Sequence, residues 1–372
     1  MSTSKSRVML TGGTGYIGSG ILLALLRAGH TVHVVVRSEA KQSQVASAPA
    51  LLSLLREVHG TADVDAFCKF FIVPDLTVRG SLDAAARGCT RVIHAASPLP
   101  HFECSGAAEQ RAQILAPAVA CTLSALESAK ASGTVERVVC TSSVGAFAAG
   151  ALLGPGYAGT EEVHVNESSL QPHVEPPFPD VLTAYCASKA TALRRSLEWM
   201  AAERAKGPVG FDLVALGPAY VGGRHPLAAS TKDLWDTSNF RYLRLITAAE
   251  KGEGPKEVAC AAHVDDVVDL HLMALDREKV KTKGEGEEGA GTELFTVAVD
   301  MLWEDVTEAT KKLFPAEVEK GVLPNAGYVG THSQVKFYSE KVEKAFGIKL
   351  KGVEAIVESL VSQYLELLEK EK

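Results

Sequence analysis

The sequence predicts an α/β protein in which helices cover both faces of a doubly wound parallel sheet. Two observations support this prediction. Short β-branched runs alternate with helical patterns through residues 1–218, and a glycine-rich turn, TGGTGYIG, joins the first strand to the first helix. The chain has 372 residues, of which 46% are hydrophobic, so it can bury a large core. We therefore expect a Rossmann-type nucleotide-binding core.

The expected elements follow one another in strict order. RVML at 7–10 is a strand, YIGSGILLALLRAG at 16–29 is a helix ending at a glycine, and TVHVVVR at 31–37 is a strand buried on both faces. Continuous apolar or β-branched runs mark the later strands, and 3.6-residue periodicity marks the later helices. The later strands are expected at 67–73, 91–96, 136–143, 211–218 and 292–299, and the later helices at 49–58, 81–88, 107–131, 184–205, 263–276 and 353–370.

The alternation loosens after Pro218, which indicates a change in organisation. We expect the nucleotide-binding core to comprise 1–218 and 263–299, and a smaller, discontinuous substrate lobe to comprise 219–262 and 300–372. The charged, glycine-rich stretch 279–291 is predicted to be an exposed loop. Two amphipathic helices are expected to finish the chain.

Composition excludes several classes of protein. The net charge of −7 argues against nucleic-acid binding, and no run approaches the ~18 apolar residues of a membrane span. The N-terminal MSTSKSR lacks the apolar region of a secretory signal. Seven scattered cysteines without a Cys-x-x-Cys pair predict reduced thiols and no structural zinc. We expect a cytoplasmic monomer or homodimer that binds small molecules.

The glycine-rich turn predicts a dinucleotide site. Glycines after a first strand let the backbone approach a pyrophosphate, whose charge lies at the N-terminus of the following helix. A plain strand-to-helix turn is the alternative, because glycine-rich turns are common. The residues expected at the cofactor are Gly12, Thr14, Gly15, Tyr16, Ile17 and Gly18.

The ends of the next strands specify the nucleotide. An NAD site usually has an acidic residue after the second strand, whereas this chain has Arg37, which suits a 2′-phosphate. A solvated strand-end charge is the alternative interpretation of Arg37. Lys41 is expected to share the phosphate, and NADP is therefore the predicted cofactor. Further cofactor contacts are expected from Asp75 and Leu76 at the adenine and from Ala95, Ala96 and Ser97 beneath the dinucleotide.

The stretch AYCASK places Tyr185 four residues before Lys189. On a helix the two side chains share a face, and a nearby ammonium stabilises the phenolate form of a tyrosine. A Tyr-x-x-x-Lys pair also occurs by chance. Here Ser143 ends the preceding strand at the edge where open α/β sheets bind ligands, so the three groups are expected to converge.

Together, TGGTGYIGSG, HVVVRS, VIHAAS, VVCTSSVGA, YCASK, GPAYVGG and HVDDV resemble the extended short-chain dehydrogenases, and most closely their dihydroflavonol-4-reductase-like branch. The resemblance implies that Ser143, Tyr185 and Lys189 are catalytic and that Pro218 and Val221 contact the cofactor. Glycine and asparagine are usual where this chain has Cys121 and Ser124. Flavonoid reductases carry an asparagine at the place of Ala148, and the Tyr-Gly of nucleotide-sugar epimerases is missing.

The predicted reaction is NADPH-dependent reduction of an aldehyde or ketone, with Tyr185 as the proton donor. The expected pocket comprises 99–102, Phe147 and 220–227, with His101, Arg224 and His225 as polar anchors. Two alternatives stay open: a nucleotide-sugar epimerase or dehydratase, and a noncatalytic NADP-binding sensor.

Two sets of polar residues receive structural interpretations. His94 lies within a predicted strand and is expected to be a core histidine. His263, Asp265 and Asp266 resemble a metal-ligand cluster, but acidic residues also suit a helix N-terminus. We therefore predict a helix start there and no metal site.

Overall fold

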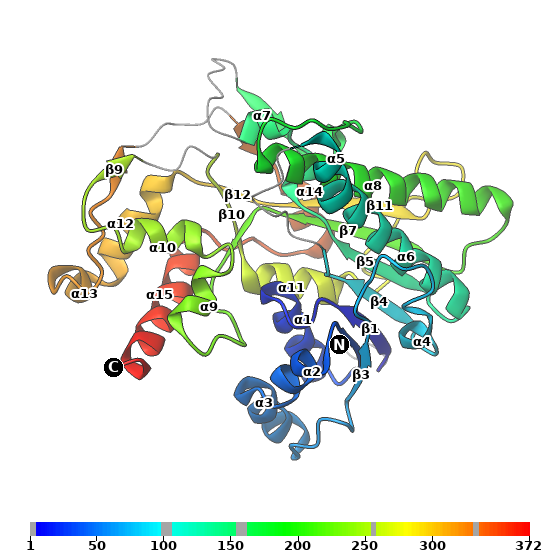
Figure 1. Cartoon of the computed structure of the whole chain (residues 1–372), viewed down its shortest axis with the longest axis horizontal. Helices are drawn as coiled ribbons and strands as arrows, with labels where there is room; N and C mark the ends of the chain where they lie inside the picture. Colours follow the sequence, from blue (N-terminus) through cyan, green and yellow to red (C-terminus); the bar gives the residue numbers. More distant parts are fainter. Residues whose placement is uncertain (1–4, 98–105, 154–161, 254–257, 330–334) are drawn as a thin grey trace.

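The computed structural model describes residues 5–97, 106–153, 162–253, 258–329 and 335–372. Its centre is a seven-stranded sheet with the strand order β3-β2-β1-β4-β5-β7-β11, and all pairings in it are parallel (Figure 1). The predicted doubly wound sheet is confirmed. Its strands are β1 (Arg7–Thr11), β2 (Thr31–Val36), β3 (Cys68–Ile72), β4 (Arg91–His94), β5 (Arg137–Thr141), β7 (Asp212–Pro218) and β11 (Thr292–Val297).

Helices cover both faces of this sheet and enclose two separate hydrophobic clusters (Figure 1). The strand order reverses between β1 and β4, where such sheets bind ligands at their carboxyl edge. The first cluster receives α1 (Tyr16–Arg27), α3 (Pro49–His59) and α11 (Val264–Met273), and the second receives α4 (Asp83–Ala86), α6 (Ala116–Ser132) and the end of α8 (Val181–Lys206).

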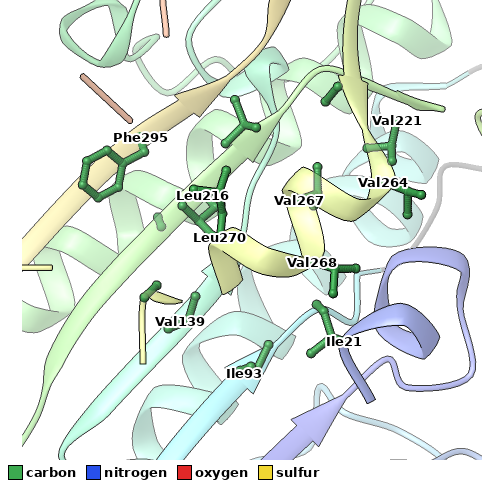
Figure 2. Close-up of a cluster of buried hydrophobic side chains, with 14 of the residues drawn as sticks. Ile21, Ile93, Val139, Leu216, Val221, Val264, Val267, Val268, Leu270 and Phe295 are labelled. Atoms are coloured by element: carbon green, nitrogen blue, oxygen red, sulfur yellow. The ribbon is translucent and has the colours of Figure 1, made fainter. Parts of the chain in front are cut away.

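Helix α11 joins α1 to the sheet, as Figure 2 shows. Val267 and Leu270 pack toward β5 and β7, whereas Val268 contacts the α1 side. At Gly20 of α1, an added Cβ would lie 2.7 Å from a Val268 methyl group. This close packing explains why both helices bury a continuous apolar stripe.

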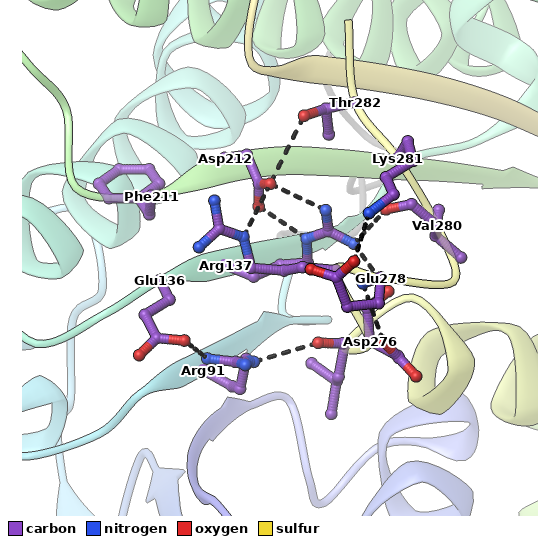
Figure 3. Close-up of polar contacts among 12 residues, drawn as sticks. Arg91, Glu136, Arg137, Phe211, Asp212, Asp276, Glu278, Val280, Lys281 and Thr282 are labelled. Atoms are coloured by element: carbon purple, nitrogen blue, oxygen red, sulfur yellow. Dashed lines mark hydrogen bonds and ion pairs between the residues drawn. The ribbon is translucent and has the colours of Figure 1, made fainter. Parts of the chain in front are cut away.

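The amino edge of the sheet holds a buried ion pair (Figure 3). Arg137 is 0% exposed, and its Nε and Nη2 donate to the two carboxylate oxygens of Asp212 at 2.6 and 2.8 Å. Its Nη1 donates to the carbonyls of Ala274 and Val280, both at 2.8 Å. The guanidinium therefore fixes the chain that follows α11 to the ends of β5 and β7.

A second group of elements lies at the left of Figure 1 and has its own core. A three-stranded sheet, in the order β12-β10-β8, packs there with four helices. Trp303, Tyr242 and Leu360 are among the buried residues of this cluster. Its elements are β8 (Tyr220–Gly222), β10 (Cys260–His263), β12 (Val299–Asp300), α9 (Thr231–Trp235), α10 (Phe240–Ile246), α12 (Trp303–Leu313) and α15 (Val353–Lys370).

Short elements were missed by the sequence pattern. The expectation of two final helices is wrong, because α13 (Pro315–Glu319) and α14 (Glu340–Phe346) lie between α12 and α15. Helices this short show no complete period. The stretch 279–291 is largely exposed, as expected. The remaining elements are α2 (Glu39–Ala46), α5 (Ala107–Gln110), a π-helical turn (Arg111–Leu115), two 3-10 turns (Val144–Ala146 and Glu167–Ser169), α7 (Gly150–Leu153), β6 (Val163–Val165), β9 (Gly252–Glu253), β13 (Tyr328–Val329) and β14 (Val335–Phe337).

One continuous helix, Ala107–Ser132, has the length and hydropathy of a membrane span, but half of its most apolar window is buried within the fold. Its α6 part packs against α8 and α4. Buried core helices of globular proteins have the same composition. We therefore assign this helix to the core of the domain.

Candidate functional site

The glycine-rich turn leaves the N-terminus of α1 open. Gly12 has a φ of +79°, and a Cβ there would lie 2.7 Å from the backbone nitrogen of Ala96. At Gly18 a Cβ would lie 2.0 Å from the Gly12 carbonyl oxygen. Gly15 caps α1 without any side-chain hydrogen bond, and the first turn has no acidic residue. Free N–H groups and the helix dipole therefore favour an anion at this point.

Arg37 is exposed at the end of β2 and pairs with no described residue. Ser38 follows it and caps α2 by accepting a hydrogen bond from the backbone nitrogen of Lys41 at 3.3 Å. The Lys41 ammonium donates to Gln44 Oε1 at 2.8 Å, on the surface. The structure thus places both basic side chains beside the carboxyl end of β2, with Arg37 the less engaged of the two.

The loops after β3 and β4 lie at the same edge. Asp75 is exposed, and its Oδ1 accepts from the backbone and hydroxyl of Thr77, which lower the pKa of this carboxyl. Leu76 is half-buried and packs on the second cluster. Ala95, Ala96 and Ser97 are half-buried, and the Ala96 contact with Gly12 brings their segment beside the glycine-rich turn.

Ser143 begins a tight turn after β5. It is 7% exposed, and its Oγ accepts from the backbone nitrogen of Gly145 at 3.1 Å. Because the hydroxyl accepts in this contact, its own proton stays available to an oxygen atom of a ligand. The turn packs against α8, since a Cβ at Gly145 would lie 3.0 Å from Cys186 Sγ, next to Tyr185.

Tyr185 and Lys189 share one face of α8, as the spacing predicts. The Lys189 ammonium lies 5.5 Å from the centroid of the Tyr185 ring. Lys189 is only 9% exposed, yet neither its ammonium nor the Tyr185 hydroxyl hydrogen-bonds to any residue in the described ranges. Burying an unpaired charge is costly, so this arrangement suits a ligand that supplies the missing partner.

A small cavity of about 30 Å³ is lined by Lys189 and by residues of α6, α8, the ends of β4 and β5, and the segment with Ala96 and Ser97. His94 lines it and is 2% exposed. The sequence predicted a core histidine, and His94 is indeed buried. It gave no indication that Nε2 of this histidine has no hydrogen-bond partner among the described residues. Hydrophobic patterning carries no signal for such an atom.

Tyr16 connects the cofactor helix to β8 in a way that the motif alone did not indicate. Its hydroxyl donates to the carbonyl of Gly223 at 2.8 Å, and burial raises the pKa of this phenol. Asn239 holds the same glycine from both sides, accepting from its nitrogen at 3.0 Å and donating to its oxygen at 2.9 Å. The start of α1 and the segment after β8 are therefore fixed to one another.

Three side chains of α15 form hydrogen bonds with Arg224 and His225, the two residues that follow Gly223. Ser359 Oγ accepts from the Arg224 nitrogen at 3.0 Å, and the amide of Gln363 bonds to both the nitrogen and the carbonyl of His225, at 2.7 and 2.8 Å. Glu366 accepts two hydrogen bonds from the Arg224 guanidinium. The sequence did not predict this role for the last helix, because its partners lie more than a hundred residues away.

Several predicted pocket residues are not placed as expected. Phe147 is 0% exposed and packs on Gly217, so it belongs to the core and not to a pocket wall. Ala148 is buried in the same cluster. Arg224 is held by Glu366, and His225 is 8% exposed with a pKa lowered by burial to about 4, so neither is a free polar anchor. The stretch 99–102, including His101, lies outside the described residues.

Pro218 and Val221 flank the end of β7 and are buried beside the first cluster. The predicted helix start is confirmed at His263, whose Nδ1 accepts from the backbone nitrogen of Asp265 at the N-terminus of α11. Asp266 accepts from the Lys351 nitrogen at 2.6 Å. These groups are used within the fold. The six described cysteines are free and buried, and Cys104 lies outside the described residues.

Comparison with known proteins agrees with this geometry. Residues 8–232 match the model of the NAD dependent epimerase/dehydratase family. Ketoreductase CTB6 of Cercospora nicotianae is 35% identical, covering 99% of this chain and 98% of its own. The NAD-dependent epimerase/dehydratase ALT6 of Alternaria alternata is 30% identical, covering 99% of both chains.

Solved structures show the same fold. The yeast methylglyoxal/isovaleraldehyde reductase Gre2, in complex with NADPH, has a TM-score of 0.73 at 23% identity and covers 98% of this chain and 99% of its own. Vestitone reductase of alfalfa has a TM-score of 0.63 at 20% identity, covering 99% of both chains. The expected resemblance is therefore confirmed: this chain belongs to the NAD dependent epimerase/dehydratase family, among its extended short-chain dehydrogenases/reductases.

Proposed function

We propose that the chain reduces the carbonyl group of an aldehyde or ketone to an alcohol with NADPH. One observation is central: Ser143, Tyr185 and Lys189 lie at the carboxyl edge of the sheet, and neither the Tyr185 hydroxyl nor the Lys189 ammonium makes a hydrogen bond to a described residue. A noncatalytic cofactor sensor has no need for an unpaired acid beside a buried ammonium. The family membership and the ketoreductase relatives support a reductase.

The described residues fit NADPH. The uncapped N-terminus of α1 at Gly15 suits the pyrophosphate, and a Cβ at Gly12 would collide with Ala96, so this turn admits only glycine. The exposed guanidinium of Arg37 suits the 2′-phosphate, with Lys41 beside it. The yeast reductase of the same fold binds NADPH in its structure.

When bound, the nicotinamide supplies the hydride that reduces the carbonyl carbon. The Tyr185 hydroxyl would donate its proton to the carbonyl oxygen as negative charge develops there. The Ser143 hydroxyl, whose oxygen already accepts from Gly145, would donate a hydrogen bond to the same oxygen and stabilise that charge. The Lys189 ammonium would stabilise the tyrosine as it loses its proton and hold the cofactor ribose.

The substrate is proposed to lie between this edge and a lobe formed by 219–262 and parts of 300–372, since β14 and α14 of the latter range pack on the first cluster of the central sheet. The three-stranded sheet, its own hydrophobic cluster and the fixed segment from Gly223 to His225 support this division. The ketoreductase relatives favour a ketone over an aldehyde. Because a buried Ala148 stands where flavonoid reductases carry an asparagine, dihydroflavonols should be poor substrates.

The proposal is tested by NADPH consumption with a panel of aldehydes, ketones, dihydroflavonols and nucleotide sugars. We expect turnover with ketones or aldehydes and little with dihydroflavonols. Conversion of a nucleotide sugar without net NADPH consumption would instead establish an epimerase or dehydratase. Tight NADPH binding without turnover of any carbonyl compound would favour the sensor.

A further inference from the structure

We propose that His94 is a positioning residue for the reaction, and that it holds a buried water molecule against the Lys189 ammonium. The proposal rests on a cavity lined by both His94 and Lys189, on the buried Nε2 of His94 that has no hydrogen-bond partner in the described part of the chain, and on an ammonium that makes no hydrogen bond to a described residue. Its catalytic consequence depends on the proposed reductase activity. The water site itself does not.

The cavity has the size and chemistry of a hydration site. Its volume of about 30 Å³ exceeds the roughly 10–15 Å³ that one water molecule needs. Polar residues from four elements line it: His94 from β4, Thr141 from β5, Thr122 from α6, and Lys189 and Ser196 from α8, together with Ser97 and Ser142 from the loops after β4 and β5. Buried water occurs where otherwise unsatisfied polar groups converge, whereas empty cavities are apolar.

His94 lines this cavity and uses only one of its ring nitrogens in the fold. Its Nδ1 lies 2.9 Å from Thr11 Oγ1, which also accepts from the backbone nitrogen of Ala96 at 3.2 Å. Its Nε2 is buried without a partner. An orphan buried polar atom costs about 1–3 kcal/mol, so a native site normally satisfies it, often with water.

His271 shows that an orphan nitrogen is not a general property of buried histidines here. It is 0% exposed, and its Nε2 lies 2.7 Å from Thr141 Oγ1 while its Nδ1 lies 2.6 Å from the Val267 carbonyl. Both ring nitrogens of His271 are therefore used by the protein. Of these two histidines, the one with an unused nitrogen is the one that shares a cavity with Lys189.

A water molecule between the two groups satisfies both. It accepts from the Lys189 ammonium and donates to the Nε2 lone pair of His94, while the Nδ1 proton goes to Thr11. The positive charge of Lys189 favours the tautomer that points a lone pair toward it. The water then fixes the ammonium in one rotamer, beside Tyr185. No proton needs to leave the site through His94.

The other titratable groups around Lys189 stay neutral, so their titration does not contribute to the alkaline limb of the pH–rate profile. Burial raises the pKa of Cys140 on β5 to about 12 and raises that of Cys121 on α6. Burial, reinforced by the charge of Lys189, lowers the pKa of His94 to about 4. A shift of the alkaline limb of the rate profile therefore reports on Lys189 and Tyr185.

The test uses two variants that separate the two nitrogens. An asparagine amide reaches the Nδ1 position, and a glutamine amide reaches the Nε2 position. His94→Asn should keep the Thr11 contact, lower kcat roughly tenfold and move the alkaline limb of kcat to lower pH by about one unit, because the ammonium loses an acceptor. His94→Gln should recover most of the rate and the original profile. His271→Asn is the control, and it should lower the free energy of unfolding without moving the limb.

The proposal is overturned if His94→Asn folds with an unchanged rate and profile, or if both His94 variants lose activity equally with an unmoved limb. A crystal structure of the wild-type protein gives a readout that needs no activity and no variant. Ordered water between His94 Nε2 and Lys189 Nζ supports the site, and its absence at a resolution that shows ordered water elsewhere in the core excludes it.

Discussion

The two edges of the central sheet each bury a positive charge, but they differ in whether that charge has hydrogen-bond acceptors. At the amino edge, Arg137 makes two hydrogen bonds to Asp212 and three to backbone carbonyls (Figure 3). At the carboxyl edge, Lys189 is almost as buried and has no hydrogen-bond acceptor among the described residues. A charge with all its hydrogen bonds made is compatible with the folded core, whereas an ammonium without an acceptor is consistent with a site that awaits a ligand. Burial alone does not distinguish the two.

The largest effect should come from Tyr185→Phe, which removes the proton donor and nearly preserves packing. Turnover should fall by about 10²–10⁴-fold, because a positioned acid contributes that much to proton transfer. The free energy of unfolding and the NADPH dissociation constant should change little. Steady-state kinetics, chemical denaturation and a fluorescence titration measure the three quantities. Wild-type turnover in this variant would remove Tyr185 from the mechanism.

Arg137→Met should show the opposite pattern at the other edge. It leaves the buried Asp212 carboxylate without its buried partner, with one remaining ion pair to the exposed Arg277 at 3.2 Å and the Thr282 hydroxyl at 3.5 Å. Breaking a buried pair costs about 3–5 kcal/mol, so the free energy of unfolding should fall by that amount while kcat per folded molecule stays the same. Denaturation and active-site titration check this. A selective loss of kcat without destabilisation would contradict the structural role of Arg137.

The double variant Arg137→Met/Asp212→Leu sharpens the comparison. Replacing both partners removes the buried carboxylate that lost Arg137, so much of the lost stability should return. Recovery would show that the ion pair with Arg277 does not compensate for the loss of Arg137. If the double variant is as unstable as the single one, the carbonyl contacts of Arg137 with Ala274 and Val280 are the main contribution.

A smaller effect is expected at Arg37, which is charged and unpaired but exposed. The native protein should prefer NADPH over NADH by at least roughly tenfold, the contribution of one charge-assisted hydrogen bond. Arg37→Asp should shrink or invert this ratio, because a carboxylate repels the 2′-phosphate and suits a free ribose hydroxyl. Turnover at saturating cofactor should stay nearly constant. Equal use of NADH by the native protein would leave Arg37 as a solvated strand end.

The carboxyl edge was largely predictable from the sequence, because its signals are local. The glycine-rich turn at Gly12, the strand-end Arg37 and the Tyr185–Lys189 spacing each lie within one short segment. The order of strands and helices followed from hydrophobic periodicity in the same way. Such local patterns place side chains on an edge or face without any knowledge of distant contacts.

Distant contacts explain what the sequence did not predict. The hydrogen bond between Gln363 and His225 joins residues 138 positions apart, and the one between Tyr16 and Gly223 joins residues 207 positions apart. Nε2 of His94 is unpaired because no donor or acceptor from another described element lies within hydrogen-bond distance of it. Phe147 fits into the core because Gly217 has no side chain there. None of these follows from spacing or composition.

The most direct test of the contrast between the edges is the free energy of unfolding of Lys189→Met without cofactor. If the ammonium is kept for function at the expense of stability, an apolar side chain of similar length should leave this free energy unchanged or raise it. Turnover of the same variant should collapse. A loss of about 3–5 kcal/mol, like that expected for Arg137→Met, would mean that Lys189 is a structural charge and would contradict the account.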